Sequence, residues 1–496
     1  MDDTLHKLRC KTYGCPKAQR GVALLLLLLI TVVAASSIFV TTVRQTTTQI
    51  ALDKNRQTHD ALARAKEALI GYALTYSEQP PTGTPPGSQP QGFLPCPDRD
   101  GDGGANPPCG GAGQSFIGML PWRQLRLPAL RDGDGECLWY AVSGNYKNNP
   151  KISLTSDTDG QLIIKDGSGT VVVGATPSDR AIAIVFAPGA PLDIQNRGGT
   201  AGTLTECGST TLGDPINQVA NYLEAFGGIN NATGTPPLPA DPSVFVSPLT
   251  VGGAQNFNDT LLAITPQDFA LVYNRMDRWV ANRVQQCITA YGSLYPWTAA
   301  LNAPSPVDPP DFNDDLSQRF GRVPDILDDS GGSWPPDPAV PVGTIVPPVY
   351  GPAFDCFEDV PGALQPGWSW WWWDTWREIV FYAVDTNYAP GGLGGAPAAL
   401  QFIDTTTATP PGPPPPPSQF VVAVAGRKLG GQQRKDANDK ANIASYLEDH
   451  NDPNFAATTP PGPAGNIPTG DEQFVTTPTV AGTAFNDTLC NDAGCP

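Results

Sequence analysis

Residues 15–45 read CPKAQRGVALLLLLLITVVAASSIFVTTVRQ, and this stretch constrains how the rest of the chain can be arranged. From Val22 to Val43 the chain contains no charged residue. As an α-helix this run would be roughly 33 Å long, enough to cross the hydrocarbon core of a bilayer. The run is preceded by basic residues at Lys7, Arg9, Lys11, Lys17 and Arg20. Because positive charge stays on the cytoplasmic side, we expect a transmembrane helix over residues 22–43 with the N-terminus in the cytoplasm.

The helical pattern continues beyond the apolar run. Residues 44–76 contain no proline, and their first glycine is Gly71. Apolar side chains recur there at three- and four-residue steps, at Leu62, Ala65, Leu69, Tyr72 and Tyr76. A conventional signal peptide has a shorter apolar region that ends at a small-residue cleavage site, so it fits poorly. We therefore expect one helix from Val22 to about Tyr76, with an apolar first half and an amphipathic second half.

A short basic leader ending in glycine, an apolar helix and an amphipathic continuation resemble the N-terminus of type IV pilins and type II secretion pseudopilins. In that family a prepilin peptidase cuts after the glycine, which implies a leader at 1–21 and cleavage between Gly21 and Val22. The resemblance also implies a single pass through the bacterial inner membrane before assembly. The ectodomain would then lie in the periplasm, or at the cell surface in a filament. The implied partners are other pilins or pseudopilins, which contact the N-terminal helix.

One position departs from the family pattern. Most members carry Glu at the fifth mature residue, where it neutralises the N-terminal amine of a neighbouring subunit, and here that residue is Leu26. A buried unpaired charge is costly, so a chain without this Glu is a poor repeating unit. The resemblance therefore implies a minor pilin or pseudopilin at the filament tip, which initiates assembly or presents a binding surface. The alternatives are an uncleaved, membrane-anchored extracytoplasmic adhesin or carbohydrate-binding module, and an anchored hydrolase.

The remaining sequence contains an internal repeat. Six blocks recur in the same order: ALIGYA (68–73) with CITAYG (287–292), GMLP (118–121) with GRVP (321–324), ECLWYAVSGNY (136–146) with EIVFYAVDTNY (378–388), IVFAPGAPLDIQNR (184–197) with VVAVAGRKLGGQQR (421–434), NQVANYLEAF (217–226) with ANIASYLEDH (441–450), and FNDTL at 257–261 and 485–489. We expect an α+β fold: the long N-terminal transmembrane and amphipathic helix, then two tandem pilin-like units, each a helix with an antiparallel sheet. Unit one spans residues 44–266 and unit two spans residues 267–496.

Composition excludes several classes of function. The formal net charge is −18, which argues against nucleic acid as a partner. The chain has three histidines, far apart in sequence, and lacks the serine-hydrolase, zinc-protease and phosphate-loop motifs. We therefore expect no enzymatic activity.

Ten cysteines are present, and eight of them follow the apolar run. An even set beyond a membrane segment indicates an oxidising compartment and up to four disulfides, with many connectivities open. Proximity in sequence favours four pairs: Cys96 with Cys109, Cys137 with Cys207, Cys287 with Cys356, and Cys490 with Cys495.

The segment DRDGDGG (98–104) is a candidate Ca²⁺ loop. Asp98, Asp100 and Asp102 alternate, and Gly103 stands where such a loop turns sharply. The twelfth position holds Cys109 instead of a bidentate Glu. Another residue would have to complete the shell, and RDGDGE offers Asp132, Asp134 and Glu136. The large pseudopilin that the chain resembles binds calcium. The alternative is a solvated Asp/Gly turn.

The segment GWSWWWWDTW (367–376) holds six tryptophans: Trp368, Trp370, Trp371, Trp372, Trp373 and Trp376. An exposed aromatic patch stacks on sugars or grips an apolar partner, which makes these residues candidates for binding. The alternative is a core strand with an edge belt.

Overall fold

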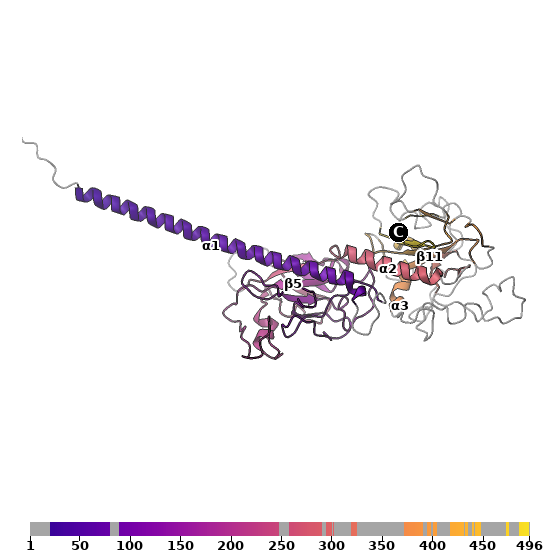
Figure 1. Ribbon diagram of the computed structural model, residues 1–496, viewed down its shortest axis with the longest axis horizontal. Helices are drawn as coiled ribbons and strands as arrows, with labels where there is room; N and C mark the ends of the chain where they lie inside the picture. The colour runs from indigo at the N-terminus through magenta and orange to yellow at the C-terminus, as the bar shows by residue number, and fades with distance from the viewer. Residues whose placement is uncertain are drawn as a thin grey trace, which may run out of the picture.

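The structure is a computed structural model with an α+β fold. It describes residues 20–79, 89–247, 257–289, 294–299, 301, 319–324, 372–389, 394–397, 400–403, 417–430, 432–434, 439–440, 442–447, 473–475 and 486–495. Within these ranges it has three α-helices: α1 (Arg20–Thr75), α2 (Ala270–Thr289) and α3 (Trp373–Trp376). Helix α1 extends far beyond the rest of the molecule at its N-terminal end (Figure 1).

The transmembrane half predicted for residues 22–43 is wrong. Among the described residues, no helix has the length and apolar character needed to span a bilayer. The predicted fold class, which included a transmembrane helix, and the predicted single-pass placement in the inner membrane are corrected accordingly.

A four-stranded antiparallel sheet packs against the C-terminal half of α1. Its strands, in spatial order, are β1 (Phe116–Met119), β2 (Trp139–Val142), β5 (Ala183–Ala187) and β9 (Thr260–Ile264). Alternate residues of a strand face opposite sides, and both faces of this sheet are buried. Tyr140 and Val185 join the core with α1, whereas Trp139 and Phe186 join a second cluster on the other face.

A second four-stranded antiparallel sheet packs against α2. Its strands, in spatial order, are β10 (Phe320–Arg322), β11 (Val380–Val384), β13 (Phe420–Val424) and β15 (Thr488–Asn491). All five residues of β11 and all five of β13 are buried. Continuous apolar strands of this kind occur where a sheet is covered on both faces.

The two sheets have the same register as well as the same strand order. In the first sheet Tyr140 is paired with Gly118 and Val185, and Val185 is paired with Leu262. In the second sheet the corresponding residues are Tyr382, Gly321, Val422 and Cys490, and they pair in the same way. These are the positions that the repeated sequence blocks place opposite each other, with Tyr140 matched to Tyr382.

Smaller elements surround the two main sheets. One small sheet has three strands: β3 (Leu162–Lys165), β4 (Val171–Val173) and β8 (Ser243–Val246). A second consists of β6 (Ala225–Phe226) and β7 (Ile229–Asn230). A third consists of β12 (Gln401–Ile403) and β14 (Gln473–Val475).

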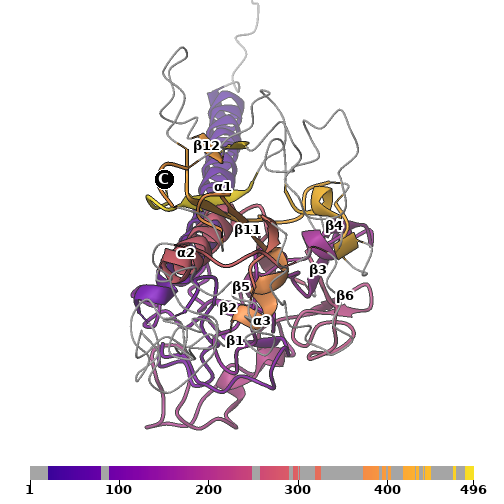
Figure 2. The ribbon, with the colours of Figure 1, turned by 90° about the vertical axis from the view of Figure 1, so that its right-hand side faces the viewer.

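The two units follow one another along the long axis of the molecule. In Figure 1, α1 and β5 lie on one side and α2 and β11 on the other, and Figure 2 shows α2 and β11 in front of the first unit. Helix α1 ends beside α2, where Arg275 forms an ion pair with Glu78. Unit two therefore extends the molecule beyond the C-terminal end of α1.

Equivalent glycines allow a neighbouring segment to approach each sheet closely. A Cβ atom at Gly118 would lie 2.7 Å from the carbonyl oxygen of Asp98, and one at Gly321 would overlap the carbonyl oxygen of Ala299. We predict that Gly321→Ala lowers the melting temperature, by the equivalent of about 1–3 kcal/mol, because the edge of the second sheet must shift to avoid the clash.

The control for this prediction is Gly430→Ala, since a Cβ atom there meets nothing within 4 Å. Thermal unfolding followed by circular dichroism measures both variants. Equal melting temperatures for the two variants would contradict the close approach at Gly321.

Candidate functional site

The N-terminal part of α1 extends beyond the rest of the molecule and includes residues 25–33 (Figure 1). We call this part the overhang, and it presents an apolar surface. Eight side chains on it have 54–69% of their surface exposed: Leu25, Leu26, Leu27, Leu28, Leu29, Ile30, Val32 and Val33. Apolar surface so extensively exposed on one element marks an interaction site. The resemblance predicts that neighbouring subunits contact this part of the helix.

The other half of α1 is fixed to unit one. Leu62, Ala65 and Leu69 are buried in the core. Lys66 lies 2.7 Å from the Asp268 carboxylate and donates to the Ala263 carbonyl oxygen at 3.0 Å. The overhang is therefore a continuation of a helix that is rigidly held by the body of the protein.

The acidic loop brings Asp98, Asp100 and Asp102 together, with one carboxylate oxygen of each within 4.8 Å of the others. Asp98 is fully buried and points into its own loop. Its carboxylate accepts hydrogen bonds from the backbone N–H groups of Asp100, Gly101 and Gly103, at 3.0, 2.8 and 2.6 Å. Burial raises the pKa of Asp98 to about 7, although these hydrogen bonds oppose the shift.

This donor set fits a calcium ion only in part. Asp100 and Asp102 are partly exposed and supply hard oxygen ligands, whereas the oxygens of Asp98 already serve to hold the loop closed. The residues proposed to complete the shell are engaged elsewhere: Asp134 binds Lys54, Glu136 binds Arg197, and Asp132 accepts from three backbone N–H groups. Calcium binding at Asp98, Asp100 and Asp102 stays a prediction.

Three of the four predicted disulfides are present: Cys96–Cys109, Cys137–Cys207 and Cys490–Cys495. The first closes the segment that contains the acidic loop, and the second ties the segment before β2 to the loop after β5. Cys287 is also disulfide-bonded. Cys356, its predicted partner, lies outside the described residues.

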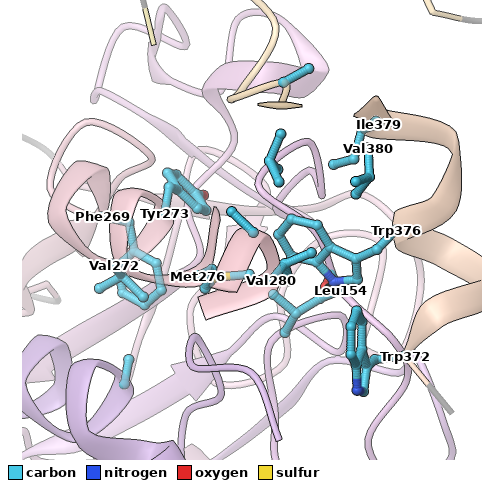
Figure 3. Packing of buried hydrophobic residues seen from close by; sticks show 14 of the residues in the cluster. Leu154, Phe269, Val272, Tyr273, Met276, Val280, Trp372, Trp376, Ile379 and Val380 are labelled. Atoms are coloured by element: carbon cyan, nitrogen blue, oxygen red, sulfur yellow. Dashed lines mark hydrogen bonds between the residues drawn. The ribbon is translucent and has the colours of Figure 1, made fainter. Parts of the chain in front are cut away.

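The tryptophan segment belongs to the core between the units wherever the structure describes it. Trp372, Trp373 and Trp376 are at most 3% exposed. The indole N–H of Trp376 donates to the Leu154 carbonyl oxygen of unit one at 2.9 Å, and Figure 3 shows Trp376 beside Leu154 and Val280. Trp372 and Trp376 therefore join unit two to unit one, and none of the three tryptophans is part of an exposed patch. Trp368, Trp370 and Trp371 lie outside the described residues.

Polar contacts complete the junction between the units. Arg427 donates to the carbonyl oxygens of Ser156 and Ser178 at 2.8 and 2.7 Å, and its guanidinium lies 3.3 Å from Asp159. Arg434 lies 2.6 Å from Asp157, with 4% and 14% of the two side chains exposed. An ion pair this well shielded is costly to break, because removing one partner leaves a buried charge. A cavity of about 750 Å³ lies beside these residues, between the units.

Arg197 and Arg434 make matching contacts within their own units. Each donates to a glycine carbonyl oxygen and to a Gln side chain, and each lies over a tyrosine ring at 4.6 Å. The acidic partners differ. Arg197 pairs with Glu136 of its own unit at 3.1 Å, whereas Arg434 pairs with Asp157 of the other unit. The sequence repeat matched the two arginines, but it did not indicate this change of partner.

Unit one contains a buried pair of carboxyl groups, Glu224 and Asp259, which the sequence analysis did not identify. Glu224 belongs to the repeated block 217–226, and Asp259 belongs to the repeated block 257–261. One oxygen of Asp259 accepts from the Glu224 backbone N–H and from the Asn231 side chain, both at 3.0 Å. The other oxygen is buried without a protein donor. Burial raises the pKa of Asp259 well above its usual range, and the nearby Glu224 charge adds to this shift. Burial also raises the pKa of Glu224.

The pair makes stability depend on pH. A carboxyl group with a raised pKa in the folded state stabilises the fold while it is protonated, and this contribution is lost as pH rises from the unfolded-state pKa towards the folded-state value. We predict that wild-type protein melts at a lower temperature at about pH 8 than at about pH 5, and that Asp259→Asn reduces the difference. Asparagine keeps the acceptor and supplies a donor to Glu224 without ionising.

Calorimetry across this pH range measures the effect. Asp166→Asn is the control, because Asp166 is partly exposed and its pKa is lowered by hydrogen bonds from Ser168 and Thr170. An Asp259→Asn variant with the same pH dependence as wild type would show that the pair does not hold a proton.

Calcium binding is testable on the same protein. We predict that Ca²⁺ raises the melting temperature and that Asp102→Asn weakens this effect by about tenfold in Ca²⁺ concentration, because one hard oxygen ligand loses its charge. Titration calorimetry gives the affinity directly. The matched control is Asp193→Asn, an exposed acid of unit one outside the loop. Equal Ca²⁺ responses in the two variants would contradict a site at Asp98, Asp100 and Asp102.

No protein-family model, no curated protein and no solved structure matches this chain.

Proposed function

We propose that this chain is a non-enzymatic minor pilin or pseudopilin at the tip of a type IV-like filament, which initiates assembly or presents a binding surface. The observation that carries the proposal is the α1 overhang, a helix anchored in the protein body at one end and exposing apolar side chains at the other. Such a helix can bury its apolar surface against the helices of neighbouring subunits, at about 25 cal/mol per Å² of apolar area.

The position of unit two supports a place at the end of the filament. Unit two lies beyond the C-terminal end of α1, on the far side of the molecule from the overhang (Figure 1). Its bulk is therefore placed where it does not obstruct subunits that pack along α1. Leu26 supports the same conclusion, because it cannot neutralise the N-terminal amine of a neighbour.

The alternative of an adhesin that binds through the tryptophan segment has less support. The three tryptophans that the structure describes are buried between the units. They are not available to stack on a sugar.

Processing at Gly21 tests the proposal. The Gly21–Val22 bond lies in the first turn of α1, whose N–H groups have no partner within the helix, so this turn can open to a peptidase. We predict that the wild-type chain begins at Val22 in cells with an active prepilin peptidase. Gly21→Val should stay uncut and be absent from filaments, whereas the control Ala23→Val should be processed. N-terminal sequencing and immunoblots of purified filaments measure both results.

Immunogold labelling of the same filaments tests the location, and label is expected at one end. A native chain that keeps Met1 would contradict the assignment to this family. Dense labelling along the whole filament would contradict the tip position.

A further inference from the structure

The cavity between the two units is lined by residues from three separate segments. They come from the turn 176–179 of unit one, from α2 and the turn before it between residues 266 and 277, and from residues 427–430 and 432–434 of unit two. Asp159 and Asn486 complete the described part of the lining. The volume of about 750 Å³ lies within the range of sites that hold small organic molecules.

Asp277 is the acidic side chain that α2 contributes to this cavity. It is 1% exposed and belongs to the face of α2 that packs against unit one. Tyr273 and Val280, a turn before it and a turn after it, lie with Leu154 in the core (Figure 3). A carboxyl group is rarely placed in such a position without a partner, because an isolated buried charge is costly.

One oxygen of Asp277, Oδ1, is buried without a hydrogen-bond partner among the described residues. The arginines nearby are engaged with other acids. Arg434 pairs with Asp157 at 2.6 Å, and Arg427 lies 3.3 Å from Asp159. The Asp277 carboxyl group therefore retains an acceptor for a ligand in the cavity.

The charges around the cavity favour a cation. Among the described residues, three acids and three bases line it, and one of these bases, Arg434, is paired with Asp157, an acid outside the lining. One acid is therefore in excess when the remaining charges are matched. The charged lining residues are Asp159, Asp179, Asp277, Arg427, Lys428 and Arg434.

The rest of the lining suits an organic molecule better than a metal ion. Ca²⁺ takes about six to eight oxygen ligands, charged carboxylates among them, but the Asp159 carboxylate is already paired with Arg427. The polar lining also includes the amide side chains of Gln267, Asn274 and Gln433. Amides both donate and accept hydrogen bonds, so they match the polar groups of an organic ligand.

We propose that this cavity binds a small organic ammonium ion, whose charged nitrogen contacts the Asp277 carboxylate. A primary ammonium group donates several hydrogen bonds and carries a positive charge, so it satisfies the Oδ1 acceptor and balances the excess negative charge together. The cavity is separate from the α1 overhang. The filament assignment therefore neither supports this site nor depends on it.

Binding should release a proton from Asp277. Burial raises the pKa of Asp277 well above its usual range; Ser156 and Arg434 oppose this shift, and the Asp157 charge adds to it. Tyr273, on the same face of α2, stays neutral because burial raises its pKa to about 12. The free protein therefore holds the proton at about pH 5, and an ammonium ion that favours the carboxylate displaces it. The affinity for the ammonium ion consequently rises with pH until Asp277 is ionised in the free protein.

Titration calorimetry of the purified full chain tests the site. Aminobutanol is the ammonium probe, and butanediol is the matched control, in which a hydroxyl group replaces the ammonium group. At about pH 5 we expect the first to bind and the second not to bind. Titrations in two buffers of different ionisation enthalpy count the protons, and about one should be released per bound amine. Nα-acetyl-lysine amide, titrated in parallel, distinguishes a free amine from the lysine side chain of a protein as the source of the ammonium group.

The substitution Asp277→Asn removes the charge and keeps the shape of the side chain. We expect it to weaken amine binding by about thirtyfold or more and to abolish proton release. The matched control is Asp259→Asn, because Asp259 is 7% exposed, similarly buried, and lies outside the cavity lining. This control should bind the amine as wild type does. Thermal unfolding shows whether both variants are folded.

The substitution Lys428→Gln changes the affinity in the opposite direction, which damage to the fold does not imitate. Removal of a positive charge from the lining should tighten amine binding by about threefold. The backbone N–H of Lys428, which donates to Asp157 at 2.7 Å, is kept in this variant. The control Lys165→Gln replaces another half-buried lysine, one outside the lining, and should leave the affinity unchanged.

The outcomes are distinct. A wild-type chain that does not bind the amine overturns the site. Equal binding by wild type and Asp277→Asn, or equal binding of aminobutanol and butanediol, also overturns it, because Asp277 would then not select the ligand by charge. Tighter binding of Nα-acetyl-lysine amide than of aminobutanol supports the site and identifies a protein side chain as the source, and the reverse order supports the site with a free amine.

Discussion

The packing of α1 on β5 and β9 is the interaction on which the rest of the structure depends. Leu62, Ala65 and Leu69 bury one face of the helix against the first sheet, and each fully buried leucine contributes about 1.5–3 kcal/mol. Lys66 reaches past this face to Asp268, just before the start of α2. The same contact surface therefore holds the overhang in place at one end and positions the second unit at the other.

The second unit repeats this arrangement and redirects one of its charges. Arg197 finds its acid, Glu136, within unit one, but the equivalent Arg434 reaches Asp157 of the neighbouring unit. In unit two, Glu378 lies at the position that corresponds to Glu136, and it pairs with Lys440 instead. Exchange of ion-pair partners in this way turns a contact within a unit into a contact between units while the surrounding backbone hydrogen bonds stay the same. The buried tryptophans then exclude water from the junction.

The acidic side chains differ in how the protein satisfies their carboxyl groups. Asp157 and Asp159 are matched by arginines at the junction, and Asp98 is satisfied by the N–H groups of its own turn. Asp259 and Asp277 differ from these acids, because each has a buried carboxylate oxygen without a hydrogen-bond partner and a pKa that burial raises well above its usual range. A carboxyl group in such a position makes the stability of the fold depend on pH.

Much of the architecture could be predicted from the sequence, because local patterns determine it. Helical spacing places Leu62, Ala65 and Leu69 on one face of α1, short sequence separation brings Cys96 to Cys109, and the repeated blocks give equivalent strands whose register depends on the alternation of side chains. The apolar run at 22–43 also predicted a membrane-spanning helix, and the described residues of the structure do not support it. The sequence alone could not show that Trp376 is buried against Leu154, that Arg434 binds Asp157, or that Asp259 lies beside Glu224. Those contacts join residues 35 to 277 positions apart, and their formation depends on how one unit docks on another and how far water is excluded, which only the tertiary structure decides.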